Sequence, residues 1–223
     1  MRSSLDDSDR DRIRKIAVHS ALGNELQHSK VGTTIFENIH ESVPAANWKV
    51  DFFVEKFLVD SLKQSSQLQR IEVAPLPKNF SRSAKEEDIL KLVREAKAKG
   101  FDALLVMLPS AYDNAPKGTE PGYGVQRIST LFNSHTSVYA LAVLNVFDTN
   151  TEKSLAWQWA FDSMMGEPNF ISKDEVAWKA KFSDYSAEEK IGIQRALKRH
   201  LEKALPFSLR ALHLLPKIES AKP

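Results

Sequence analysis

Six histidines are the side chains of this 223-residue sequence that could most readily bind a metal ion or transfer a proton near neutral pH. A zinc-protease helix needs the pattern His-Glu-x-x-His, and two metal ligands on one helix face need i,i+4 spacing. Neither arrangement occurs among His19, His28, His40, His135, His200 and His213. We therefore predict no metal site.

Other catalytic patterns are also missing. The chain has no cysteine, which excludes thiol nucleophiles, thiolate metal sites and disulfides. The nucleophile elbow Gly-x-Ser-x-Gly is absent, and Gly122-Tyr123-Gly124 lacks the third glycine of a dinucleotide-binding turn. Lys117-Gly118-Thr119 lacks the upstream glycine of a phosphate-binding loop. We interpret both glycine groups as turns, predict no catalytic residue and no cofactor, and favour a function that is not enzymatic.

Several residues could instead line a binding surface. Tyr112 and Asp113 follow a predicted buried strand over residues 102–108, and ligands of open α/β sheets bind beyond the carboxyl ends of strands. Tyr123 lies in a glycine- and proline-rich segment that we predict as a long loop over residues 110–127. Large apolar side chains gather in segment 162–185, namely Met164, Met165, Phe170 and Trp178. This segment is either a partner-binding surface or a loop that packs back onto the sheet.

The charge balance argues against some partners. Lys plus Arg number 31 and Asp plus Glu number 29, so the chain has no excess of positive charge for binding nucleic acid. No apolar run approaches the length that a bilayer span requires, so we predict no transmembrane segment in this chain. Another protein, or a second copy of the chain, remains as the expected partner.

The first half of the sequence alternates strands and helices. Apolar residues of Val50–Leu62 recur at helical spacing, and a second helical stripe over residues 89–99 ends at Gly100. Strands are predicted over residues 16–22, 31–36, 68–76 and 102–108. Helices between strands predict crossover units and a partly parallel sheet.

The second half is predicted to be antiparallel. Two strands over residues 137–147 and 154–161 are joined by a short polar turn, which is typical of a hairpin. We expect the bulky alternate residues of the second strand, from Leu155 to Phe161, to face the core. A capping box at Ser186 begins a long C-terminal helix, which Pro206 should kink or split.

These elements predict a single α/β domain with three-layer character. Its mixed sheet has a strand–helix–strand–helix–strand first half, an antiparallel hairpin in the second half and a long C-terminal helix. We expect a flexible leader over residues 1–14, the domain over residues 15–215 and a tail over residues 216–223.

The order of these elements, together with the hairpin that carries Asp148-Thr149 before its turn and Glu152-Lys153 after it, resembles a group of bacterial envelope α/β domains. The group comprises the TolB N-terminal domain, the curli-secretion lipoprotein and the outer-membrane activators of peptidoglycan synthases. The resemblance implies a domain of the periplasm or outer membrane that binds other proteins or self-assembles and has no catalytic residues. Members are often lipid-anchored through an N-terminal cysteine, so an anchor here would require a leader that has been removed.

The sequence thus supports two hypotheses. The first is a protein-interaction or assembly module of the bacterial cell envelope, which uses segments 110–134 and 162–185 as its variable surfaces. The alternative is a small-molecule-binding protein, or an enzyme with a dispersed site near the end of strand 102–108, with a cytoplasmic location as the alternative to the envelope.

Overall fold

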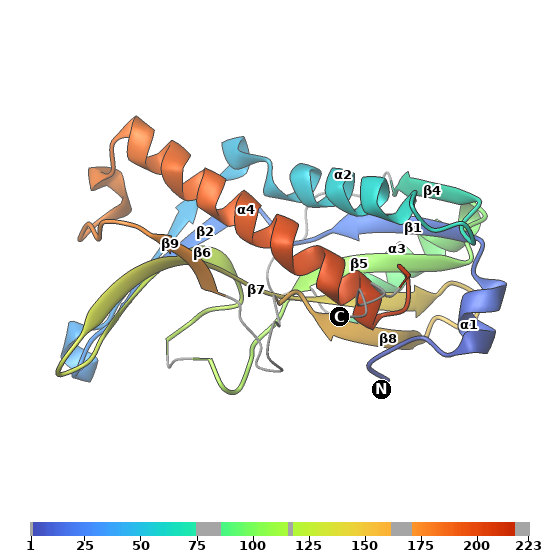
Figure 1. The fold of residues 1–223 in the computed structure, drawn as a ribbon, viewed down its shortest axis with the longest axis horizontal. Coiled ribbons are helices and arrows are strands. Elements are labelled where there is room, and N and C mark those ends of the chain that lie inside the picture. Colours follow the sequence, from blue (N-terminus) through green and yellow to red (C-terminus); the bar gives the residue numbers. More distant parts are fainter. Residues whose placement is uncertain (1, 75–85, 116–117, 162–170, 217–223) are drawn as a thin grey trace, which may run out of the picture.

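The computed structural model describes residues 2–74, 86–115, 118–161 and 171–216. They form a mixed sheet of nine strands, with helices α2 and α4 on one face and α3 on the other (Figure 1). This confirms the predicted α/β class, the mixed sheet and the long C-terminal helix. The division into a single domain over residues 15–215 stays a prediction.

One half of the sheet is built from crossover units. Strand β1 (Lys15–Ser20) pairs in parallel with β4 (Arg70–Val73) on one side and β5 (Ala103–Pro109) on the other. Helix α2 (Val50–Leu62) covers one face of these strands and α3 (Glu86–Ala98) covers the other. Because both faces are covered, β5 is apolar on both sides, as the sequence predicts. We call this part the crossover half.

The other half is an arm of mixed strands, in which β2 and β6 pair in parallel and the remaining pairs are antiparallel. It contains β2 (Glu25–Val31), β3 (Ile39–Pro44), β6 (Gly122–Ser129) and β9 (Ile171–Glu175). Strand β7 (Ser134–Asp148) belongs to both halves, because its first part pairs with β6 and its last part pairs with β5. The strand order is β3-β2-β6-β7-β5-β1-β4, with β8 (Ser154–Trp159) and β9 also paired to β7. The arm extends to the left in Figure 1.

Helix α4 (Ala187–Ala211) runs over the sheet from the arm to the crossover half (Figure 1). Its predicted capping box is present, with the Ser186 hydroxyl and the Glu189 carboxylate each accepting a backbone N–H. The helix continues through Pro206 and is not split there. Leu201, Leu205 and Leu209 are completely buried, and this packing offsets the hydrogen bond that proline cannot donate.

The first residues are folded, which corrects the prediction of a flexible leader over residues 1–14. Helix α1 (Asp7–Arg12) is capped by Asp6, and the flanking Leu5 and Ile13 are each only 1% exposed. Two buried apolar side chains and a cap are enough to order a short helix against the rest of the fold. The leader prediction failed because these two residues show no helical periodicity.

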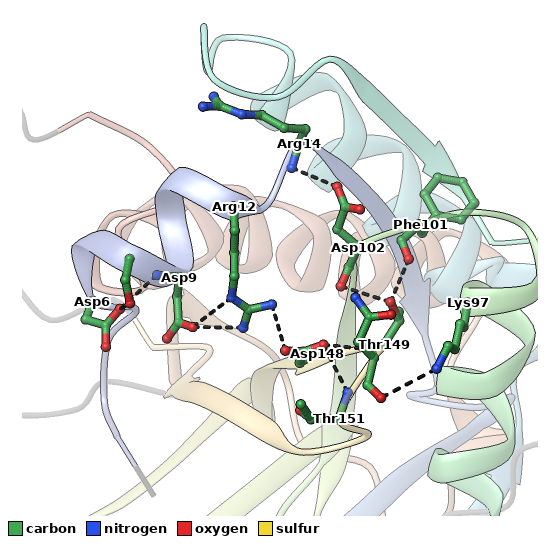
Figure 2. A network of polar contacts seen from close by, with 12 residues as sticks. Asp6, Asp9, Arg12, Arg14, Lys97, Phe101, Asp102, Asp148, Thr149 and Thr151 are labelled. Atoms are coloured by element: carbon green, nitrogen blue, oxygen red, sulfur yellow. Dashed lines mark hydrogen bonds and ion pairs between the residues drawn. The ribbon is translucent and has the colours of Figure 1, made fainter.

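A polar network holds α1 against the crossover half (Figure 2). The guanidinium of Arg12 lies between the carboxylates of Asp9, at 2.8 Å, and Asp148, at 2.6 Å. Asp148 also accepts the backbone N–H of Asn150 at 2.7 Å and of Thr151 at 3.2 Å, which closes the β7–β8 turn. The Asp-Thr pair that opens this turn therefore has a structural role at the end of the sheet.

The predicted loop over residues 110–127 contains the first part of β6, which is a correction. A Cβ atom at Gly124 would lie 2.0 Å from the Gln27 carbonyl oxygen and 2.9 Å from Cε1 of Tyr139. Glycine is needed here because a neighbouring strand and an aromatic ring approach the backbone closely, so it does not mark a turn. The strand predicted over residues 31–36 is likewise wrong in position, since β2 ends at Val31.

The hairpin of β7 and β8 is antiparallel, as predicted, but its bulky face is not the core beneath α4. The register shifts between Val146 and Phe147, which places Leu155 and Ala156 together in the core cluster under the helices. Trp159 and Phe161 lie on the opposite face, with their rings stacked at 5.0 Å. Beyond this β-bulge, the bulky residues that alternate along the second strand face the side of the sheet away from α4.

Candidate functional site

Two connections meet at the far end of the arm. The 3-10 turn η1 (Ile35–Glu37) follows β2, and residues 130–133 join β6 to β7. Val31 pairs with Ile128, and Ser129 pairs with Ser134, so both connections lie at the same end of neighbouring strands (Figure 1). We call these two connections the tip.

The tip exposes three large apolar side chains. Phe36 is 93% exposed, Leu131 is 78% exposed and Phe132 is 97% exposed. Single exposed apolar residues are common on proteins, but a group of them at one end of an extended arm is typical of an interaction surface. The tip is therefore the candidate functional site.

Local hydrogen bonds fix the backbone of both tip connections. Thr130 donates its N–H to the Asn133 carbonyl at 2.7 Å, and its hydroxyl accepts the Asn133 N–H at 3.1 Å. In the other connection Glu37 donates its N–H to the Thr34 carbonyl at 3.1 Å, and Gly32 donates to the Asn38 side chain at 2.9 Å. Because the turns satisfy their own polar groups, they hold the apolar side chains outward in a defined arrangement.

The flanks of the tip carry charges of both signs. The Lys30 ammonium lies 3.9 Å from the Glu37 carboxylate, which is a weak surface pair. Arg127 donates a hydrogen bond to the Ser134 hydroxyl at 2.8 Å. An apolar centre with a charged rim has the usual composition of a protein–protein contact.

An aromatic cluster around His28 joins the arm to the start of α4. The buried imidazole stacks on Trp178 at 4.2 Å and meets the edges of Phe182 and Tyr185. Nδ1 of His28 lies 3.4 Å from the Glu41 carboxylate. Burial lowers the pKa of His28, and the neighbouring carboxylate opposes that shift only in part. The imidazole therefore acts as a neutral ring that packs the segment before α4 onto β2.

A second polar cluster lies where β1 ends and α2 begins. The Asp51 carboxylate accepts the Ser20 hydroxyl at 2.6 Å and the Leu22 and Gly23 N–H groups at 2.9 and 3.2 Å. Burial raises the pKa of Asp51, while these three donors act in the opposite direction. Since its oxygens are already used by the fold, Asp51 is best explained as the anchor of the β1–β2 connection.

Across residues 2–74, 86–115, 118–161 and 171–216, no group of three His, Asp or Glu side chains is placed to hold a metal ion. No helix within these ranges is both long and apolar enough to cross a membrane.

Of the residues predicted from sequence to bind a partner, those that the structure describes do not converge on one site. Tyr112 packs its ring against Trp159 and Phe161, on the face of the sheet away from α4. Tyr123 is completely buried and donates its hydroxyl to the Gly23 carbonyl at 3.1 Å. Asp113 is exposed, and Trp178 is half-buried against His28. Met164, Met165 and Phe170 lie outside the described residues.

Sequence reasoning did not single out Phe36, Leu131 or Phe132, although segment 110–134, predicted as a variable surface, contains Leu131 and Phe132. The signal that could have singled out these two is the adjacent pair Leu131-Phe132 between Thr130 and Asn133, where two turn-forming residues enclose two apolar ones. Such a pair reads as the end of a strand unless the register of β6 and β7 is known. Their exposure is a property of the assembled sheet.

Comparison with known proteins gives only distant similarity. No family model matches the sequence, and no curated protein matches it. A solved PelC dodecamer from Paraburkholderia phytofirmans is 10% identical, with 94% of this chain and 93% of that chain covered and a TM-score of 0.37. Protein XCC0632 from Xanthomonas campestris is 8% identical, with 95% and 92% covered and a TM-score of 0.36. Similarity of this size does not define the family or the function of this chain.

Proposed function

We propose that this chain is a protein-interaction or assembly module of the bacterial cell envelope, located in the periplasm or at the outer membrane, and that it binds its partner through the tip. The observation that carries the proposal is the exposure of Phe36, Leu131 and Phe132 on two hydrogen-bonded turns at the end of the arm. The envelope location rests on the resemblance of the element order and of the Asp148-Thr149 hairpin to envelope domains.

Energetics favour a tip that is covered by a partner. Burying one large apolar side chain contributes about 1.5–3 kcal/mol, so three of them provide a strong contact even after the cost of association. The side chains also contribute little to packing within the chain while they are this exposed. The tip therefore resembles a preformed group of binding hot spots.

The proposal is tested by photo-cross-linking in cells. A photoreactive phenylalanine analogue at position 132 should give a discrete adduct, identified by mass spectrometry, with another protein or with a second copy of the chain. The same analogue at position 52 is the control, because Phe52 is exposed but lies on α2, away from the tip. Equal adducts at both positions, or none at position 132, would refute a binding role for the tip.

A second candidate function, small-molecule binding, has one observation in its favour. A cavity of about 630 Å³ lies between α3 and the β7–β8 hairpin. Its apolar lining is Ile89, Leu90 and Phe147, and its polar and charged lining is Glu86, Asn145, Glu152, Lys153 and Ser154. Its volume lies within the range of ligand sites. A Leu90→Trp variant would fill it, so a metabolite that raises the Tm of the natural chain but not of this variant would support ligand binding.

A further inference from the structure

A groove between α2 and α4 has a size and lining suited to apolar side chains such as those of the tip. Phe53 and Phe57, one turn apart on α2, form one wall, and Pro206 on α4 together with Leu215 forms the other. The groove has a volume of about 560 Å³, and its lining is more apolar than polar. Its walls come from α2, from α4 and from Leu215, all of which pack on the core, so the groove is preformed.

The groove and the tip lie toward opposite ends of the molecule. The tip is at the end of the arm, while Pro206 and Leu215 lie near the C-terminal end of α4, over the crossover half (Figure 1). One chain cannot place its own tip in its own groove. A tip that enters a groove must therefore come from a neighbouring copy.

The charges at the two surfaces are complementary. Four charged residues line the groove, namely Lys56, Asp60, Glu202 and Arg210. Lys56 and Asp60 pair with each other, whereas Glu202 and Arg210 take part in no ion pair within the part of the chain that the structure describes. Beside the tip, Glu37 has its weak pair with Lys30, while Arg127 on β6 has no carboxylate partner among the described residues. Arg127 of one copy therefore has a complementary acid in Glu202 of another, and such a pair orients a partner.

We infer that the partner of the tip is a second copy of this chain, whose α2–α4 groove receives Phe36, Leu131 and Phe132. This inference rests on the proposed function and names its partner. The contact joins two different surfaces, so it is heterologous: repeated from copy to copy, it produces a ring if the rotation closes and a filament if it does not.

Light scattering on two complementary variants tests this arrangement. Phe36→Ser/Phe132→Ser removes the tip at two exposed positions, and Pro206→Glu places a charge in the groove at a position where glutamate favours the helix. Each variant alone should be monomeric, with self-association weakened at least about tenfold. Phe52→Ser is the matched control and should assemble like the natural chain.

An equimolar mixture of the two variants is the decisive measurement. The groove of the tip variant is intact and so is the tip of the groove variant, so the mixture should form dimers of one copy of each and nothing larger. A contact between two tips predicts instead that Pro206→Glu assembles normally and that mixing has no effect. That result would overturn the inference.

A charge exchange gives an independent readout on exposed residues. Arg127→Glu and Glu202→Arg should each weaken assembly, and the two together in one chain should restore it. Failure of the double variant to recover would contradict the assigned orientation.

The outcomes also separate this inference from the proposed function. If the natural chain is monomeric at about 100 µM, which excludes self-association of useful affinity, the inference is wrong. A cross-link from position 132 to a different protein would still leave the tip as an interaction surface.

Discussion

The two halves of the sheet share β7 but are covered in different ways. On the face away from α4, the crossover half has α3 packed over Leu104 and Val106, which are completely buried. On the same face of the arm, Val31 and Ile128 are half-buried, and the strands continue beyond them to an exposed apolar tip.

The difference indicates a division of roles. Ion pairs and backbone hydrogen bonds hold the ends of the crossover half, where Asp148 fixes the β7–β8 turn and Arg12. Among the described residues, the free end of the arm is held by short-range hydrogen bonds within its turns, by one hydrogen bond from Arg127 to Ser134 and by the weak pair of Lys30 with Glu37. Stability is concentrated where the sheet is covered on both sides, and the exposed apolar surface is placed where it does not affect folding.

Core truncation should produce the largest difference between the halves. Leu104→Ala should lower the free energy of unfolding by about 2–5 kcal/mol, because it opens a cavity beneath α3. Ile128→Ala, on the same face of the arm, should cost roughly 1 kcal/mol, since its side chain is already partly exposed. Urea denaturation measures both. Equal losses would mean that the arm is as well packed as the crossover half.

A second, smaller difference in stability between the two halves should appear at carboxylates that accept backbone N–H groups. Asp148→Ala should cost about 1.5–3 kcal/mol, as expected for hydrogen bonds to a charged group that is nearly buried. Glu41→Ala should cost about 0.5–1.5 kcal/mol, because Glu41 accepts the Phe182 N–H on the arm with a more exposed side chain. A larger loss at Glu41 would reverse the assignment of stability to the crossover half.

The Asp148 carboxylate should also make stability depend on pH. Burial acts to raise its pKa, but the Asn150 and Thr151 N–H groups and Arg12 outweigh burial and lower it. The stabilisation is present above the unfolded pKa of about 3.9 and is lost as the pH falls through the lower native value. Asp148→Ala should abolish this part of the acid dependence.

His28 should make the arm sensitive to a milder acidity. Burial among Trp178, Phe182 and Tyr185 lowers its pKa, whereas Glu41 and Asp184 act to raise it, and Lys179 and the Tyr185 hydroxyl lie in the same segment. A histidine whose native pKa is depressed stabilises the fold above its unfolded pKa of about 6.5, and this stability declines as the pH falls below that value.

Thermal unfolding between pH 7.5 and 5.5 measures the effect, with His28→Phe as the matched variant. The natural chain should lose more Tm on acidification than His28→Phe, because phenylalanine keeps the stacked ring but binds no proton. Parallel Tm profiles for the two proteins would show that the cluster tolerates a protonated imidazole.

Much of the crossover half could be predicted from sequence, because its signals are local. The apolar stripe of Val50–Leu62 defines α2 to the residue, and Gly100 adopts a φ of 77° at the end of α3 as its position suggests. These features depend on neighbours within one or two turns of the same helix.

The arm and the N-terminal helix could not be predicted in this way. Gly124 reads as a turn residue, and only the approach of Gln27 and Tyr139 from other strands shows why a strand needs glycine there. Helix α1 is held by the burial of Leu5 and Ile13 and by the pairing of Arg12 with Asp148, a residue far away in sequence. The tip is hardest of all, because it is defined by what the assembled sheet leaves uncovered.

The smallest effect on the free energy of unfolding is expected at the tip. The same substitution can be made at Phe182, a buried residue that packs against the arm just before α4. Phe132→Ser should change the free energy of unfolding by no more than about 0.5 kcal/mol, because the ring is almost fully exposed. Phe182→Ser should cost about 3–5 kcal/mol, because that ring is buried against Trp48 and His28.

For folded protein, the effects of the two substitutions on self-association should rank in the opposite order. At matched concentrations Phe132→Ser should weaken self-association about tenfold without loss of Tm, since one apolar anchor is removed from the contact alone. A Tm loss at Phe132 comparable to that at Phe182 would mean that the tip is packed within its own chain in solution. The arm would then be covered like the crossover half, and the surface proposed to bind a second copy would not exist.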